Sequence, residues 1–210
     1  MNIKPYKDES LNVIYNGIFC DLPELYTTAA LQPADYPWNV LLDKGAAEES
    51  LLAVAADPAV ESRIKLLVYH QLRQKGFHID SKELLGVIIE VRFENGLDVV
   101  AAFKDGTARY INQAEKLIIW ETTTAESEKL IYNLFSESLK VVSKIGAWDK
   151  PRLAQPGIDD VRISFLVADG LYFGQGPFDA LAKDAMGGPV IQAAGQLMLF
   201  LTDKVLAKAE

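Results

Sequence analysis

An α+β fold, in which helices pack on an antiparallel sheet, is predicted by two stretches of this 210-residue chain. Residues 85–121 alternate short apolar runs with turn dipeptides, and residues 161–173 repeat that pattern. Strands joined by such short turns pair antiparallel, because parallel strands need long crossovers. Helical periodicity precedes and follows these strands instead of alternating with each of them, which is typical of an α+β fold and not of a doubly wound one.

The N-terminal part of the chain is predicted to be helical. Residues 9–19 place their apolar side chains on one helical face, and residues 46–56 form a short helix with two glutamates near its positive end. Between these helices, residues 21–43 hold three prolines, and Tyr36-Pro37 is a candidate cis peptide. We expect this segment to be a packed connector.

A third helix is expected from Asp57 to about residue 75. Asp57 suits the N-cap, because its carboxylate can accept hydrogen bonds from free backbone amides, and Pro58 suits the first helical position. Gly76 is well placed to end the helix, since glycine adopts the left-handed conformation of many helix ends.

Residues 85–121 are predicted to form a four-stranded meander. Asn95-Gly96 and Asp105-Gly106 are typical of two-residue turns in which both positions take a positive φ. If both turns are tight, one face of the sheet carries two rows of polar side chains, and the opposite face is the core. Arg109 would then lie on the core face, where it either pairs with Asp98 or sits at the rim of the sheet. The two rows are Glu90–Ala101–Tyr110 and Arg92–Val99–Asn112.

The rest of the chain is predicted to complete the sheet and to cover it. Residues 124–145 form an amphipathic helix, for which Thr123 and Glu126 suit a capping box. A second hairpin follows, with its turn at Asp169-Gly170. Two further helices are expected at residues 177–184 and 189–208.

The length fits a single α+β domain over residues 1–210. Within it, residues 1–80 are a possible helical subdomain, and residues 81–210 supply the sheet and the helices that pack on it. Lys and Arg number 21 against 29 Asp and Glu, a net charge of −8, which argues against nucleic-acid binding. We therefore expect no nucleic-acid partner for this acidic chain.

The one cysteine, Cys20, cannot form an internal disulfide, and the N-terminus lacks the apolar core of a signal peptide. We therefore expect a cytoplasmic protein with no membrane span. His70 and His78 are eight residues apart, which does not match a helical metal pair, so both are predicted to be solvated. No nucleophile elbow or Walker motif occurs, and we expect no metal and no cofactor.

The polar rows are the best candidate surface for a small ligand. Glu90, Arg92, Tyr110 and Asn112 would surround small residues and leave a shallow pocket. The turn of Gly174, Gln175 and Gly176 follows a strand and opens a helix, an arrangement that presents backbone amides to an anion. An anionic or sugar-like ligand would suit these residues.

Residues 185–202 carry no charge, although two glutamines interrupt them. A helix this apolar must be covered by its own sheet or by another subunit. In the second case Leu197, Phe200 and the small Gly195 would lie at a homodimer interface.

Three functions follow from these patterns. The first is a non-catalytic interaction or self-association domain, because no catalytic constellation is apparent. The second is a small-ligand binder that uses the polar rows. The third is a hydrolase or isomerase, in which Glu90 acts as a carboxylate catalyst and Tyr110 as an acid.

Overall fold

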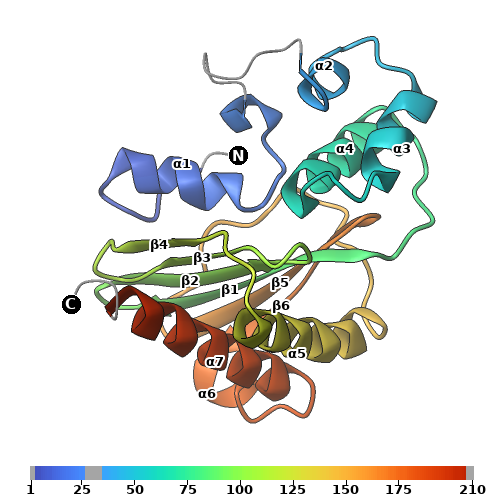
Figure 1. Ribbon diagram of the computed structural model, residues 1–210. Helices are drawn as coiled ribbons and strands as arrows, with labels where there is room; N and C mark the ends of the chain where they lie inside the picture. Colours follow the sequence, from blue (N-terminus) through green and yellow to red (C-terminus); the bar gives the residue numbers. More distant parts are fainter. Residues whose placement is uncertain (1–2, 27–34, 207–210) are drawn as a thin grey trace.

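The computed structural model describes residues 3–26 and 35–206 of the chain, and it has the α+β fold that the sequence predicts (Figure 1). The strands are β1 (Leu84–Phe93), β2 (Gly96–Phe103), β3 (Ala108–Ile111), β4 (Leu117–Trp120), β5 (Asp160–Val167) and β6 (Gly170–Pro177). The helices are α1 (Glu9–Gly17), α2 (Trp38–Leu41), α3 (Glu48–Ala56), α4 (Ser62–Gln74), α5 (Ala125–Val142), α6 (Phe178–Leu181) and α7 (Gly187–Leu206), with the 3-10 turn η1 (Pro23–Tyr26).

The six strands form one antiparallel sheet in the order β4-β3-β2-β1-β5-β6. The predicted meander supplies β1 to β4, and the predicted later hairpin supplies β5 and β6. The hairpin joins the meander through β5, which pairs with β1. Both parts of the sheet prediction are confirmed.

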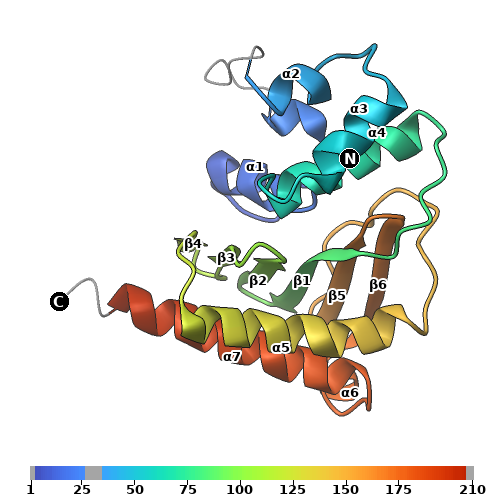
Figure 2. The same cartoon turned by 45° about the vertical axis from the view of Figure 1, so that its right-hand side comes forward.

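Helices cover both faces of the sheet. Helices α5 and α7 pack side by side on one face, and the N-terminal helices lie over the other (Figures 1 and 2). Each face has its own hydrophobic cluster, and the cluster under the N-terminal helices includes side chains from those helices and from the sheet. The central strands are therefore buried on both sides, so neither face has the solvated polar rows expected of a half-exposed sheet.

Helix α4 begins later than its sequence predicts. Asp57 accepts a hydrogen bond from the Ala59 amide at 2.8 Å, but this interaction closes a turn instead of capping the helix. The helix starts at Ser62, whose amide donates to Asp105 at 2.7 Å while its hydroxyl accepts from the Asp105 amide at 3.0 Å. The contact of Ser62 with the β2–β3 turn thus determines where α4 begins. Gly76, with φ of 85°, ends the helix as predicted.

The first hairpin has a different register from the predicted one. Phe93 pairs with Gly96, so the two-residue loop is Glu94-Asn95, and neither loop residue has a positive φ. A Cβ on Gly96 would lie 2.6 Å from the carbonyl oxygen of Gln113. Gly96 is therefore required by close packing and not by turn geometry.

The other two predicted turns also differ from expectation, one in length and one in position. The β2–β3 loop is longer: Gly106, with φ of 88°, occupies the left-handed position before Thr107, whose carbonyl accepts from the Phe103 amide. In the last hairpin Val167 pairs with Gly170, which moves the turn back by one residue. These shifts change which side chains share a row.

Three smaller predictions have clear outcomes. The Tyr36-Pro37 peptide is cis. The capping box of α5 lies one residue later than predicted, since Thr124 and Ser127 exchange hydrogen bonds between side chain and backbone. Among the helices that the structure describes, none is both long and apolar enough to cross a membrane.

Candidate functional site

The structure separates the two polar rows that the sequence predicts. Glu90 lies opposite Val99, and Tyr110 lies opposite Val100, so their side chains occupy opposite faces of the sheet. The predicted row Glu90–Ala101–Tyr110 is wrong, because the longer β2–β3 loop shifts the pairing of β3 with β2 by one residue and so moves Tyr110 to the other face. A mechanism that pairs Glu90 with Tyr110 therefore has no structural basis.

The remaining residues of the predicted ligand surface have structural contacts of their own. The Asn112 side-chain oxygen accepts from the amides of Ala114 and Lys116 at 3.0 and 2.9 Å, which holds the β3–β4 turn. Arg92 lies apart from it, in a hollow of about 330 Å³ with Phe93 and Phe178. The second predicted row is not formed either.

The glycine turn is part of a strand. Gly174, Gln175 and Gly176 lie within β6, and the helix that follows, α6, is a single turn. The Gln175 side chain accepts from Arg162 at 2.8 Å. The predicted presentation of several helical amides to an anion is therefore absent from this segment.

Helix α7 is covered by the chain's own sheet. Leu197 is fully buried, and Phe200 packs edge-on against Trp120, with ring centroids 5.1 Å apart. Gly195 is half-buried, and no atom lies within 4 Å of the position its Cβ would take. The side chains of Leu197 and Phe200 are thus unavailable at the surface of a single chain for a subunit contact.

A buried polar cluster lies between α1 and the sheet. Tyr15 donates a hydrogen bond to Glu90 at 2.6 Å, and Arg162 approaches the other carboxylate oxygen at 3.5 Å. Glu90 is fully buried, and this burial raises the pKa of its carboxyl group. Arg109 is a second buried cation, and its partner is Glu121 at 2.7 Å, not Asp98 as predicted.

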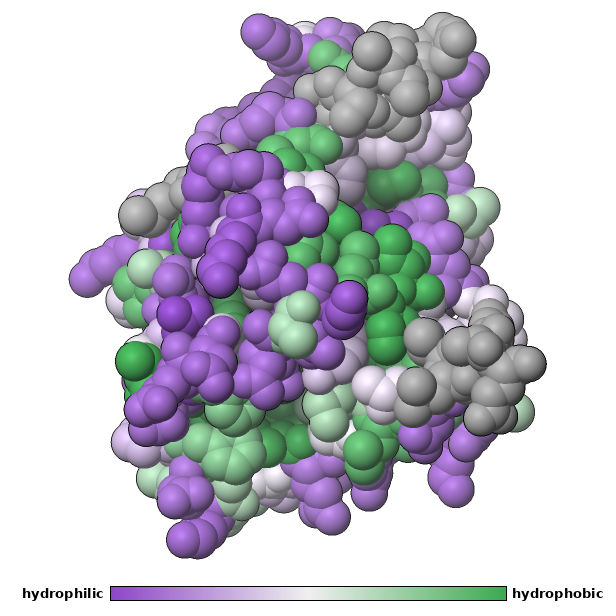
Figure 3. Space-filling view, turned by 90° about the vertical axis from the view of Figure 1, so that its left-hand side faces the viewer, coloured by the Kyte–Doolittle hydropathy of each residue, from purple (hydrophilic) through white to green (hydrophobic). Residues whose placement is uncertain are grey.

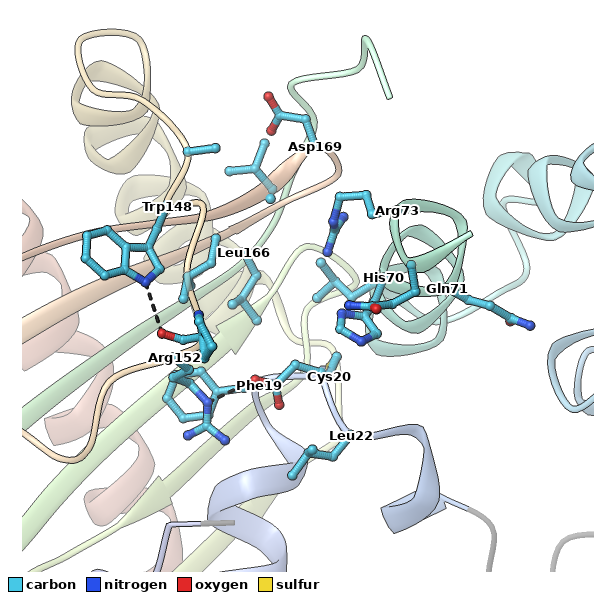
Figure 4. Close-up of a pocket in the computed structure, with 18 of the residues that line it drawn as sticks. Phe19, Cys20, Leu22, His70, Gln71, Arg73, Trp148, Arg152, Leu166 and Asp169 are labelled. Atoms are coloured by element: carbon cyan, nitrogen blue, oxygen red, sulfur yellow. Dashed lines mark hydrogen bonds and ion pairs between the residues drawn. The ribbon is translucent and has the colours of Figure 1, made fainter. Parts of the chain in front are cut away.

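A cleft of about 990 Å³ opens beside this cluster. Four segments that are distant in the sequence line it: residues 19–24 after α1, residues 66–74 of α4, residues 147–152 after α5, and residues 166–171 around the β5–β6 turn. Figure 4 shows His70, Gln71 and Arg73 projecting from α4 toward the cleft, with other walls formed by the remaining segments. This is the candidate functional site.

One wall of the cleft is anchored by Arg152. Its guanidinium donates to Asp21 at 3.0 Å and to Asn16 at 3.0 Å, and it stacks on the Phe19 ring at 3.9 Å from the ring centroid. Arg152 is 8% exposed, so it ties the connector after α5 to the end of α1 in a largely water-free environment. The wall is therefore held by a charge-assisted contact.

The opposite wall carries a second pair of unlike charges. Arg73 donates to the backbone carbonyl of Ala168, and Asp169 accepts from the Tyr172 hydroxyl at 2.7 Å. Burial lowers the pKa of Arg73, and the Asp169 charge opposes that shift. Arg73 and Asp169 thus bring charges of opposite sign to the same part of the lining.

Several buried polar atoms in these walls have no hydrogen-bond partner among the described residues. Four of the eight such side-chain atoms in the described chain belong to residues that line the cleft. They are Asp21 Oδ1, Gln71 Oε1, Arg152 Nη1 and Asp169 Oδ1. Buried polar atoms normally have hydrogen-bond partners, so four unpartnered atoms among the residues of one cleft are an unusual feature of the described chain.

The two groups with the most familiar catalytic chemistry are poorly suited to it. Cys20 is buried, and burial raises the pKa of its thiol to about 12, which keeps the thiolate scarce. Burial, aided by Arg73, lowers the pKa of His70, which favours the neutral form of its imidazole. His70 is half-buried and not solvated as predicted, whereas the His78 side chain is 87% exposed.

Sequence reasoning missed this cleft, although one signal was available. Leu66, His70 and Arg73 follow helical spacing and share one side of α4, although the sequence pattern predicts a solvated His70. The other walls come from turns and connectors that show no periodicity. Among the described residues, no cluster of three or more His, Cys, Asp or Glu side chains could hold a metal ion.

Comparison with known proteins matched this chain to no family model, no curated protein and no solved structure. Arguments about function therefore rest on the geometry and chemistry of the cleft.

Proposed function

We propose that this protein binds a small polar ligand in the cleft between α4, the α1–η1 turn and the β5–β6 turn, without chemically transforming it. The observation that carries the proposal is the gathering of unpartnered buried polar atoms in its walls. The volume is at the upper end of the roughly 300–1,000 Å³ that small-ligand sites span.

Binding is favoured over catalysis by the state of the lining groups. The Cys20 thiol is protonated and buried, and it contacts backbone carbonyls and Tyr26. Asp21 and Asp169 each already have one carboxylate oxygen in a hydrogen bond. Such groups can orient a ligand, while none is an activated nucleophile.

Native mass spectrometry of freshly purified, undialysed protein tests this proposal. We expect extra mass on each chain, and we expect Gln71→Leu to reduce it because the variant removes an unpartnered amide oxygen from the cleft. Gln192→Leu, on an exposed position of α7, is the matched control and should retain the mass. If the protein carries no ligand, and no member of a fragment library shows binding that Gln71→Leu weakens, the proposal is wrong.

A second candidate function is association with a protein or with another copy of the chain. Strand β4 is an edge of the sheet, and its Ile119 side chain is 53% exposed. Figure 3 shows a face of the molecule on which hydrophobic surface gathers among polar side chains. Exposed apolar surface of this kind favours a partner. The same mass spectra would support association if they show a dimer with no additional mass.

A further inference from the structure

We infer that the ligand of the cleft is a neutral, polyhydroxylated molecule, a saccharide or a polyol. This inference rests on the proposed binding function and specifies the chemistry of its ligand. It is carried by how the charges in the cleft are paired and by which polar atoms are left over.

Charged side chains of both signs line the cleft, and one acid and one base among them form an ion pair. Asp21 forms an ion pair with Arg152 at 3.0 Å, while Arg73 and Asp169 line the opposite wall, where Arg73 donates to the Ala168 carbonyl and Asp169 accepts from Tyr172. A ligand with a full positive or negative charge would therefore meet a like charge at short range on either wall. A neutral ligand avoids that penalty and still gains hydrogen bonds to charged groups.

The unpartnered atoms require a ligand that both donates and accepts hydrogen bonds. Three of the four are oxygens, on Asp21, Gln71 and Asp169, and they need donors from the ligand. The fourth is Nη1 of Arg152, which needs an acceptor. A hydroxyl group can meet either need, whereas phosphate or sulfate would bring negatively charged oxygens against the two carboxylates.

Apolar side chains complete the lining. Phe19, Leu22, Leu66, Leu166 and Leu171 lie among the polar residues of the cleft. A sugar ring or a polyol chain has hydroxyl groups along its edge and C–H groups on its faces, so it can use both kinds of surface. A ligand with only polar surface would leave the leucines in contact with water.

A matched set of sugars tests the inference. We would measure binding to the full chain by saturation-transfer NMR and titration, using neutral hexoses, disaccharides and alditols as the panel. Glucosamine and glucuronate serve as charged counterparts of glucose, and inorganic phosphate serves as a small anion. We expect at least one neutral member to bind, and we expect the amino and acid forms of that sugar to bind at least tenfold more weakly.

Two variants connect the binding to the cleft. Asp169→Asn keeps one oxygen as the acceptor for Tyr172 but replaces the unpartnered carboxylate oxygen with an amide NH2 group, which donates and cannot accept. We therefore expect about tenfold weaker binding of the neutral ligand. Asp179→Asn, an exposed position on α6, is the matched control and should bind as the unmodified protein does. Thermal unfolding of both variants verifies that each is folded.

The possible outcomes distinguish a failure of this inference from a failure of the proposed binding function. Suppose that a charged sugar binds more tightly than its neutral counterpart, or that only charged probes bind, and that Asp169→Asn abolishes this binding. The inference of a neutral ligand would then be wrong, while the proposal that the cleft binds a ligand would stand. Equal affinity of Asp169→Asn and the unmodified protein for a neutral sugar would remove the cleft as its site. No binding by any probe, together with an empty native mass spectrum, would overturn both proposals.

Discussion

Tyr15 on α1 donates a 2.6 Å hydrogen bond to the carboxylate of Glu90 on β1, and neither side chain is exposed to solvent. The contact joins the N-terminal helical layer to the central strand of the sheet. It also places an ionisable group in the interior, close to the wall of the candidate ligand cleft.

Tyr15→Phe should lower the free energy of unfolding by about 1–3 kcal/mol, because it leaves a buried carboxylate oxygen without its donor. Urea denaturation followed by fluorescence measures the change. Tyr132→Phe is the control, since Tyr132 is 77% exposed and should change stability by less than about 0.5 kcal/mol. Equal effects of the two variants would show that the buried contact contributes nothing.

Glu90→Gln should alter the pH dependence of stability. Burial raises the pKa of Glu90 in the folded protein above its ordinary value of 4.5, so the folded state binds its proton more tightly than the unfolded state does. The protein therefore loses stability as pH rises from about 4.5 through the raised pKa, and the glutamine variant lacks this loss. Denaturation at pH values from 4 to 8 measures it. A difference between the two proteins that stays constant with pH would contradict the assignment.

Gly96→Ala should destabilise the protein by about 1–3 kcal/mol, because the new methyl group would lie 2.6 Å from the backbone carbonyl oxygen of Gln113. Gly174→Ala offers a matched comparison in another strand, since no atom lies within 4 Å of its added methyl group. We expect this second variant to be neutral or slightly more stable. Thermal unfolding of the two variants measures the difference. A Gly174→Ala protein less stable than Gly96→Ala would be incompatible with the β1–β2 register described above.

Leu197→Ala should cost about 2–5 kcal/mol of stability, since it opens a cavity beneath α7. Leu199→Ala, on the outer side of the same helix and 58% exposed, should cost less than about 0.5 kcal/mol. Chemical denaturation combined with light scattering measures stability and oligomeric state together. If Leu197→Ala is soluble and as stable as the unmodified protein but changes its oligomeric state, Leu197 lies at a subunit contact and not in the core.

Cys20 should resist alkylation in the folded protein. Its thiol is buried, with a pKa raised to about 12, and only the thiolate reacts readily with iodoacetamide. At pH 8 we expect labelling to be slow in buffer and fast in 8 M urea, as followed by mass spectrometry of the single cysteine. Rapid labelling of the folded protein would place the thiol at the surface and reopen its role as a nucleophile.

The sheet was largely predictable because its hairpins are local. Turn residues at Gly96, Gly106 and Gly170 mark the correct places in the chain, and the strand order of the meander follows from them. The exact register did not follow, since Gly96 and Gly170 are selected by neighbouring atoms and not by a positive φ. A shift of one residue moved Tyr110 to the opposite face from Glu90.

The cleft was not predictable from the sequence for a different reason. Asp21, Gln71, Arg152 and Asp169 lie in four separate segments, and no local pattern links them. Arg152 in particular sits in a connector rich in proline, where its spacing carries no information about α1. Only the tertiary arrangement brings its guanidinium to Asp21 and Phe19.

The strand order also has a consequence for the rate of folding. Four of the five strand pairings join neighbours in the chain, and only β1 with β5 joins distant segments, as when Val91 meets Val161. Local hairpins close quickly, whereas long-range pairing must first overcome the entropy of closing a long loop. We therefore expect the meander and the β5–β6 hairpin to form early. The pairing of β1 with β5, which also brings the walls of the cleft together, should then be the slow step of folding.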